Sequence, residues 1–314
     1  MTTRKKTLPQ LEFGGGGRFG AAEGSEIEES HVAAPDATPL YVRRMRGPSA
    51  TTALFCDGIA CDGFIWKYLW RDLAARLSLA HFHYRGHGRS GAPRDPERID
   101  VEAHAADADC VRRAIGDPPL VLIGHSFGTQ VMLETYRQRP EGIRALVFLC
   151  GSFGRVTYTF KNTDVLANVL PNLLGFVSRH PHMGRALWSH VPPNIALSLA
   201  RLTGDVDPAR VDPEDVEPYF RHVMHLDFAL FLRMLRAAGE HTAEDLLPRI
   251  AVPCLVVAGE LDSFTPPSVS RAMAEAIPGA ELAMVAGGSH LLPLERRDEV
   301  FEILSDFLTR KVGA

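Results

Sequence analysis

The sequence lacks a strong excess of charge of either sign, and it lacks long apolar runs. Its 314 residues carry 34 Lys and Arg against 38 Asp and Glu, a formal net charge of −4, with the basic residues scattered along the chain. A dispersed and nearly balanced charge argues against a nucleic-acid surface. No stretch approaches the roughly 18 consecutive apolar residues of a membrane span. We therefore expect neither a nucleic-acid partner nor a membrane span.

Cysteine is also scarce, and it lacks the spacing of a metal site or a disulfide framework. The five cysteines are Cys56, Cys61, Cys110, Cys150 and Cys254. Their number is odd, no CxxC pair occurs, and three of them end or begin apolar runs, as small buried hydrophobic residues do. The three basic residues at positions 4–6 are not followed by the apolar segment of a secretory signal. These features favour a reducing compartment, and we expect a cytoplasmic protein.

Residues 1–36 are poor in apolar side chains and rich in Gly and Glu, as in FGGGGRFG and GSEIEES. Such a composition is typical of a flexible tail. The alternative, a phosphate-binding loop, needs a strand before the glycines and a GK[ST] motif after them, and the sequence has neither.

From residue 37 onward, apolar runs typical of buried strands recur. They are LYVRRMR (40–46), TTALFC (51–56), SLAHFHY (78–84), LVLIG (120–124), ALVFLC (145–150), CLVVAG (254–259) and ELAMVA (281–286). Several are continuously apolar, as strands buried on both faces are. Amphipathic helical stretches lie between them. The alternation predicts an α/β fold with a mostly parallel, doubly wound sheet of the eight-stranded type.

One gap interrupts this alternation. About a hundred residues between the ALVFLC and CLVVAG runs lack a strand pattern, far more than a normal crossover needs. They contain helical segments, and residues 217–239 are apolar nearly all round, so that helix needs burial on more than one side. We expect a core formed by residues 37–152 and 247–314, with residues 153–246 inserted as a helical cap that partly lines an apolar pocket.

The stretch GHSFG places a serine in a sharp turn between a strand and a helix. Gly124 and Gly128 lie two residues before and two after Ser126, where a tight turn leaves no room for side chains. The turn would lift the Ser126 hydroxyl to the amino end of a helix, where an oxyanion is favoured. His125 is expected to pack under the turn.

A serine hydroxyl is a weak nucleophile that needs a base, and the base needs an acid to orient it. Asp262 follows the CLVVAG strand, and His290 follows the last strand after a pair of glycines. Both positions lie beyond the carboxyl ends of strands, where side chains can converge. Glu260 is a rival for the acid, and Asp262 could instead only cap the next helix. We prefer Asp262 because it lies further into the loop.

From about residue 38 to its end, the chain resembles the α/β-hydrolase superfamily in its Ser-Asp-His, carboxylesterase-like form with a helical cap. The resemblance rests on GHSFG, GELD, GGSH and YRGHGRSG. It implies that Ser126, Asp262 and His290 form a catalytic triad. In the superfamily, a loop that here corresponds to CDGIACDG (56–63) supplies a second oxyanion donor.

By position, the resemblance implies that the backbone N–H groups of Ile59 and Phe127 bind the oxyanion. Where the superfamily commonly has His-Gly, this chain has Asp57-Gly58. Because the donor is a backbone group, the mechanism survives the change. Asp57 could place negative charge near the pocket and disfavour anionic acyl groups, or it could be a loop aspartate that bonds its own backbone.

We therefore expect a serine hydrolase that cleaves carboxylic esters of small to medium lipophilic substrates through an acyl-enzyme, with no metal and no organic cofactor. Thioesterase, lactonase, carbon–carbon bond hydrolase and cofactor-free perhydrolase or haloperoxidase activities use the same constellation and stay open. A ligand-binding receptor that keeps a vestigial triad belongs to a different class. The oligomeric state and the natural substrate are left open.

Overall fold

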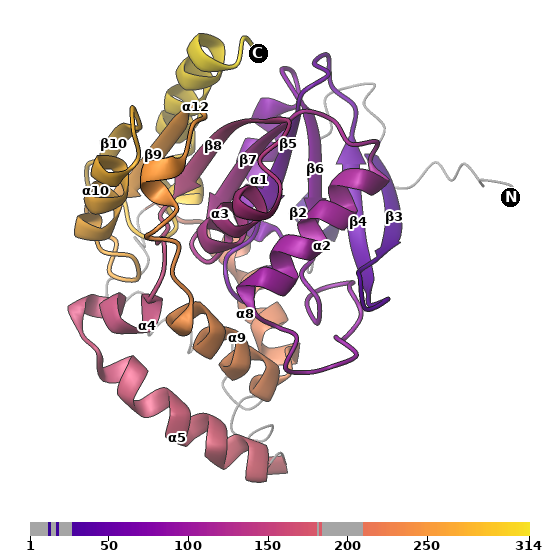
Figure 1. Ribbon diagram of the computed structural model, residues 1–314, viewed down its shortest axis with the longest axis vertical. Helices are drawn as coiled ribbons and strands as arrows, with labels where there is room; N and C mark the ends of the chain where they lie inside the picture. The colour runs from indigo at the N-terminus through magenta and orange to yellow at the C-terminus, as the bar shows by residue number, and fades with distance from the viewer. Residues whose placement is uncertain (1–11, 14–16, 19–26, 181, 184–209) are drawn as a thin grey trace, which may run out of the picture.

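A mixed eight-stranded sheet forms the centre of the molecule (Figure 1). The computed structural model describes residues 12–13, 17–18, 27–180, 182–183 and 210–314. The strands of this sheet are β3 (Ile27–Ala33), β4 (Pro39–Met45), β5 (Thr52–Cys56), β6 (Ser78–Phe82), β7 (Leu120–His125), β8 (Ile143–Leu149), β9 (Cys254–Gly259) and β10 (Glu281–Val285). Their spatial order is β10-β9-β8-β7-β5-β6-β4-β3.

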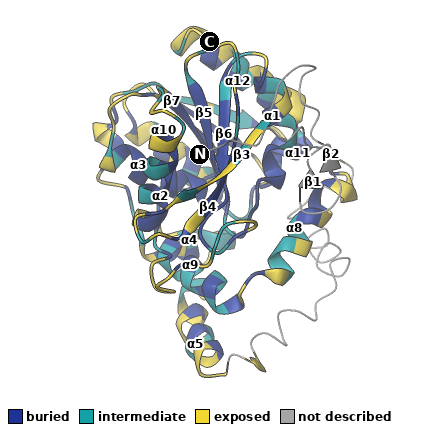
Figure 2. Ribbon diagram, turned by 90° about the vertical axis from the view of Figure 1, so that its right-hand side faces the viewer, coloured by how far each residue is buried: buried dark blue, intermediate teal, exposed yellow. Residues whose placement is uncertain are grey.

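The six strands from β10 to β6 are parallel, whereas β4 and β3 add an antiparallel edge. Strands β5, β7 and β9 are buried at every position, as their unbroken apolar runs predict. Figure 2 shows β5 and β7 in the dark blue of buried residues. Alternate side chains therefore point into two separate apolar layers. Leu54 and Leu122 enter one layer, while Phe55 and Ile123 enter the other. The predicted α/β fold with a mostly parallel, doubly wound sheet is confirmed.

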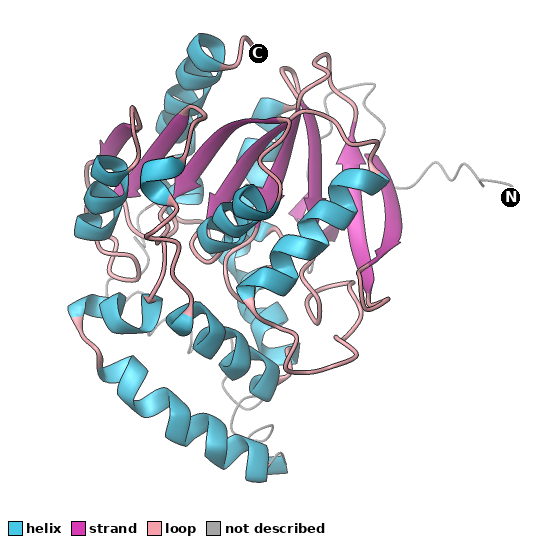
Figure 3. Ribbon diagram, viewed as in Figure 1, coloured by secondary structure: helices cyan, strands magenta, loops and turns pink. Residues whose placement is uncertain are grey.

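Helices cover both faces of the sheet (Figure 3). They are α1 (Lys67–Leu73), α2 (Val101–Ala114), α3 (Gly128–Gln138), α10 (Pro267–Ala276), α11 (Leu292–Glu295) and α12 (Arg297–Lys311), with the short 3-10 helices η1 (Phe64–Trp66) and η3 (Leu247–Arg249). Helices α2, α3 and α10 pack on the layer that contains Leu54, and α1, α11 and α12 pack on the layer that contains Phe55. Among the described helices, none is long and apolar enough to cross a membrane.

The amino-terminal edge of the sheet differs from the prediction. Ile27–Ala33, which we expected to be tail, forms β3 and pairs with β4 along its whole length. The sheet thus begins ten residues before the boundary expected for the core. The segment was missed because its exposed edge carries polar side chains, so its composition resembles that of a tail. Two short strands, β1 (Glu12–Phe13) and β2 (Gly17–Arg18), pair with each other. The remainder of residues 1–26 lies outside the described residues.

The stretch between β8 and β9 contributes helices that lie beyond the carboxyl ends of the parallel strands (Figure 1). They are α4 (Val156–Thr159), η2 (Phe160–Asn162), α5 (Val165–Arg179), α8 (Pro213–His225) and α9 (Phe228–Glu240). Residues 184–209, which belong to the expected cap, lie outside the described residues. The apolar segment 217–239 is not one helix, because Asp227 caps a new helix by accepting a hydrogen bond from the Leu230 N–H at 2.8 Å.

Candidate active site

Ser126 occupies the tight turn that the GHSFG motif predicts. β7 ends at His125, α3 begins at Gly128, and Ser126 between them has a φ of 54°, a left-handed conformation that few non-glycine residues adopt. A Cβ at Gly124 would lie 2.6 Å from the Gly128 carbonyl oxygen, and one at Gly128 would lie 2.0 Å from that of Cys56. Both glycines are thus needed for close backbone packing. Strain of this kind at a nucleophilic side chain is typical of a functional site.

We expect Gly128→Ala to destabilise the protein by about 3 kcal/mol or more, because its methyl group has no space beside the Cys56 carbonyl. Urea titration of the free energy of unfolding measures this effect. Gly175→Ala is the matched control. Gly175 lies within α5, and a Cβ there would meet nothing closer than 3.8 Å. The free energy of unfolding of that variant is expected to rise by up to about 1 kcal/mol, because alanine has a higher helix propensity than glycine. Equal unfolding free energies would contradict the packing argument.

The structure brings Ser126, His290 and Asp262 together. His290 Nε2 lies 3.0 Å from Ser126 Oγ. On the other side of the ring, His290 Nδ1 lies 2.9 Å from Asp262 Oδ2 and 3.1 Å from Oδ1. Asp262 is buried and Ser126 is half-buried. With a carboxylate accepting at Nδ1, the ring proton resides there, and Nε2 is left as an acceptor for the serine proton.

Asp262 is held in its ionised form. Burial by itself would raise the pKa of this carboxyl, but the nearby His290 and hydrogen bonds from His290 and Thr265 keep the pKa below its usual value. Its Oδ1 accepts the backbone N–H groups of Phe264 and Thr265, both at 2.9 Å. The rival acid Glu260 is exposed and instead accepts the Gly287 N–H at 3.1 Å. The preference for Asp262 over Glu260 therefore agrees with the geometry.

Two residues that the sequence patterns do not single out hold the loop and the ring of His290. Both carboxylate oxygens of Glu295 accept from Ser289, one from its hydroxyl at 2.5 Å and the other from its backbone N–H at 2.8 Å. Phe264 stacks on the His290 ring with centroids 4.8 Å apart. Neither residue lies in a motif, so only the acid five residues after His290 could have served as a signal.

His125 lies beside the histidine loop rather than only under the turn. Its Nε2 donates to the backbone carbonyl of His290 at 2.9 Å. Burial, with the neighbouring His290, lowers the pKa of His125 to about 3. This ring therefore stays neutral, and it couples the serine turn to the loop that carries His290.

The expected oxyanion loop runs directly over the serine turn. A Cβ at Gly58 would lie 3.1 Å from His125 Nδ1 and 3.4 Å from Ser126 Cβ. Among the described residues, the backbone N–H groups of Ile59 and Phe127 have no hydrogen-bond partner. Two unpaired donors beside a serine hydroxyl are the arrangement that an oxyanion requires.

The structure contradicts both expectations for Asp57, a charge near the pocket and a bond to its own backbone. It is fully buried and does not line the pocket at Ser126, so its charge does not face that pocket. Its carboxylate bonds the side chains of Trp66 and His81 rather than its own backbone. Asp57 is thus a core residue beneath the loop.

A small apolar pocket of about 230 Å³ opens at Ser126 and His290. Its other lining residues are Gly58, Ile59, Cys61, Phe64, His125, Val216, Tyr219, Phe220, Phe264 and Leu291. None of these side chains is an acid, a lysine or an arginine. Val216, Tyr219 and Phe220 come from one face of α8, and Tyr219 stacks on Phe64 with centroids 4.9 Å apart. The inserted helices thus contribute part of the apolar lining, as expected.

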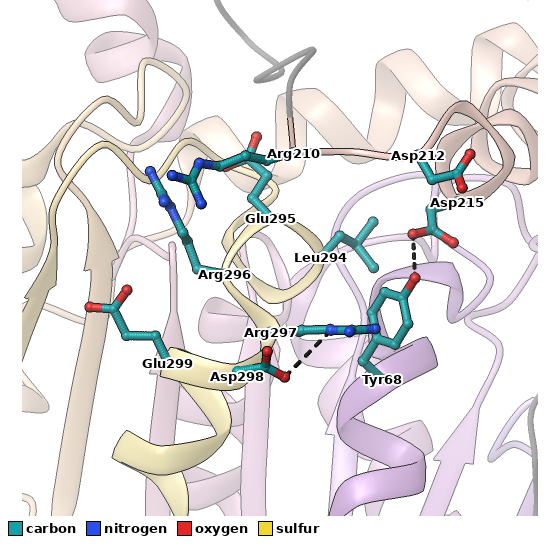
Figure 4. Close-up of a pocket in the computed structure, with 10 residues that line it drawn as sticks. All are labelled: Tyr68, Arg210, Asp212, Asp215, Leu294, Glu295, Arg296, Arg297, Asp298 and Glu299. Carbon is teal, nitrogen blue, oxygen red and sulfur yellow. Dashed lines mark hydrogen bonds and ion pairs between the residues drawn. The ribbon is translucent and has the colours of Figure 1, made fainter.

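A second, polar pocket of about 390 Å³ lies apart from the triad, between α1, the start of α8 and the start of α12 (Figure 4). It is lined by Tyr68, Arg210, Asp212, Asp215, Leu294, Glu295, Arg296, Arg297, Asp298 and Glu299. It contains none of the predicted site residues. Within the part of the chain that the structure describes, no three His, Cys, Asp or Glu side chains are grouped as a metal site requires.

Comparison with known proteins agrees with this fold. The model of the alpha/beta hydrolase fold family matches residues 54–296. The chain is 29% identical over 261 residues to polyketide synthase ThaQ of Burkholderia thailandensis, covering 82% of this chain but only 12% of that protein. It is 23% identical over 265 residues to RutD of Klebsiella pneumoniae, provisionally named as a carbamate hydrolase, covering 83% of this chain and 92% of that protein.

Two solved structures with the same fold are an esterase from Exiguobacterium antarcticum and the enol-lactonase from Burkholderia xenovorans. The first has a TM-score of 0.72 at 20% identity and covers 90% of this chain and 100% of its own. The second has a TM-score of 0.70 at 21% identity and covers 89% and 100%. The family match and the curated relatives support hydrolytic activity. With its sheet, its serine turn and this match over most of its length, the chain belongs to the α/β-hydrolase fold family.

Proposed function

We propose that the protein is a serine hydrolase that cleaves esters of small to medium lipophilic carboxylic acids. The observation that carries the proposal is the hydrogen-bonded chain from Ser126 through His290 to Asp262, which opens into an apolar pocket. A serine and a histidine joined in this way, with the histidine oriented by a carboxylate, form an activated nucleophile.

In this mechanism, the hydroxyl of Ser126 attacks the acyl carbon while His290 Nε2 takes the proton. The backbone N–H groups of Ile59 and Phe127 bind the oxyanion, each worth about 3 kcal/mol of transition-state stabilisation. His290 then returns the proton to the leaving alcohol, and an acyl group remains on Ser126. Water activated by His290 releases the acid. Asp262 holds the imidazole and stabilises its charged form.

The lining of the pocket supports a lipophilic substrate. Aromatic and aliphatic side chains surround Ser126, and an anionic acyl group would find no cation among the described lining residues. A volume of about 230 Å³ suits a short or medium acyl chain better than a long one.

The test is hydrolysis of p-nitrophenyl esters from acetate to decanoate. We expect an optimum among the shorter chains, since decanoate would extend beyond the pocket. Phe220→Ala enlarges the lining on α8 and is expected to raise the rate on longer esters relative to butyrate by about tenfold. Phe176→Ala, an exposed phenylalanine of α5, is the control and should leave the profile unchanged.

A chain-length profile of Phe220→Ala that matched the wild-type profile would contradict this assignment of the pocket. Absence of ester hydrolysis that depends on Ser126 would refute the esterase proposal. In that case thioesters, lactones, carbon–carbon substrates and perhydrolysis are the next reactions to measure. Retention of a ligand without turnover would instead favour a receptor.

A further inference from the structure

A buried hydrogen-bond network holds Asp57 at the base of the expected oxyanion loop. Asp57 directly follows β5 and is fully buried. Its Oδ1 accepts from the indole N–H of Trp66 at 2.6 Å, and its Oδ2 lies 2.8 Å from His81 Nε2. Its backbone carbonyl accepts from the Tyr84 hydroxyl at 3.0 Å. Three side chains thus fix both the carboxylate and the backbone of one residue.

Asp57 and the nearby Arg43 are both buried, and neither lines the pocket at Ser126. Burial raises the pKa of Asp57 to about 7, while the Trp66 N–H and the guanidinium of Arg43 act in the opposite direction. Burial holds the pKa of His81 well below its usual value, so its ring is neutral and donates through Nε2. Arg43 is itself buried and lies over the Trp70 ring, 4.8 Å from its centroid. Burying an acid is costly unless it is hydrogen-bonded, and the bonds to Trp66 and His81 offset that cost.

The backbone next to Asp57 is the part of the loop that faces Ser126. On one side, a Cβ at Gly128 would lie 2.8 Å from the Asp57 carbonyl oxygen. On the other side, a Cβ at Gly58 would lie 3.4 Å from Ser126 Cβ. The unpaired N–H of Ile59 belongs to the Gly58–Ile59 peptide, which directly follows the Asp57–Gly58 peptide. A small rotation of the Asp57–Gly58 peptide would therefore move this N–H relative to the reacting carbonyl.

From this geometry we propose that Asp57 is a positioning residue, whose bonds to Trp66, His81 and Tyr84 set the direction of the Ile59 N–H in the oxyanion hole. The inference rests on the proposed serine mechanism. Asp57 touches no substrate and acts only through the peptide that follows it. Since the N–H has to meet the oxyanion rather than the ground-state carbonyl, the loss of its alignment should appear in kcat.

Two tryptophans offer a matched pair of variants. Trp66 and Trp70 are both buried and both pack against Phe55, with ring centroids 4.9 and 5.7 Å away. The Trp66 indole N–H bonds Asp57, whereas no partner is found for that of Trp70 among the described residues. Trp66→Phe and Trp70→Phe therefore remove similar volume, and only the first releases Asp57.

We expect Trp66→Phe to lower kcat for p-nitrophenyl butyrate by about 30-fold with KM within twofold, since a misplaced donor costs up to about 100-fold. Trp70→Phe should stay within about threefold of wild type. Butylboronic acid is a second readout, because its tetrahedral adduct on Ser126 occupies the oxyanion hole. Its inhibition constant should rise about 30-fold in Trp66→Phe, in parallel with the loss of kcat. Thermal unfolding checks that both variants fold.

Should Trp66→Phe fail to fold, Tyr84→Phe removes the bond to the Asp57 carbonyl and is expected to show the same loss of kcat at constant KM. Equal kcat values for the two tryptophan variants, or a change in KM alone, would overturn the role of Asp57 while leaving the esterase proposal intact. A wild-type protein without turnover that depends on Ser126 would overturn both.

Discussion

Replacing Ser126 by alanine is expected to lower kcat for p-nitrophenyl butyrate by about 10⁵-fold, and His290→Ala should cost about as much. Ser126 Oγ and His290 Nε2 are hydrogen-bonded at 3.0 Å and act as a unit, because the nucleophile is activated only while the base can take its proton. The double variant should therefore be no slower than either single variant. Single-turnover kinetics under excess enzyme measures the residual rates.

The control for this experiment is Ser270→Ala. Ser270 is a buried serine of α10, and its hydroxyl has no hydrogen-bond partner among the described residues. This variant should keep the wild-type kcat within about twofold. If Ser126→Ala retained most of its activity, or if the losses of the two single variants multiplied in the double variant, the acyl-enzyme mechanism would be refuted.

The sequence predicts the sheet and the triad because each leaves a local pattern. Buried strands such as LVLIG are continuously apolar, and a serine flanked by two glycines at a strand end is typical of a sharp turn that presents a nucleophile. The order of Ser126, Asp262 and His290 along the chain reflects parallel strands whose carboxyl ends meet at one edge. The sheet brings these three side chains to the same place, so their convergence can be expected from the sequence.

What the sequence does not predict depends on contacts between distant segments. Asp57 is separated from His81 by 24 residues and from Arg43 by an entire strand, and neither pairing leaves a pattern in the chain. The bonds between Glu295 and Ser289 depend on the short helix α11, which has too few residues to show periodicity. β3 was missed because an edge strand that faces solvent has a polar composition.

Asp262→Asn is expected to lower kcat by about 10⁴-fold while the fold is retained. Oδ1 of Asp262 accepts from two backbone N–H groups, so the asparagine oxygen would be held at this position. Its amide nitrogen would then face His290 Nδ1 at the position of Oδ2, 2.9 Å away. Because an amide donates where the carboxylate accepts, the ring proton would move to Nε2, and His290 could no longer take the proton of Ser126.

The matched control is Glu260→Gln, which makes the same change of acid to amide in the same loop. Glu260 is exposed and accepts only the Gly287 N–H among the described residues, so kcat should stay within about twofold of wild type. A larger loss in Glu260→Gln than in Asp262→Asn would assign the acid to Glu260 and reverse the prediction.

The pH dependence of stability gives an independent check on Asp262. Its pKa is lowered in the folded protein, so the ionised carboxylate stabilises the fold above the unfolded pKa of about 4, and this contribution is lost as the pH falls through the folded pKa. Asp262→Asn lacks the titrating group. The difference in unfolding free energy between wild type and this variant should therefore shrink as the pH falls below about 4. A difference that grew as the pH fell below about 4 would mean that Asp262 is not held as an anion in the folded protein, and the orienting role would fail with it.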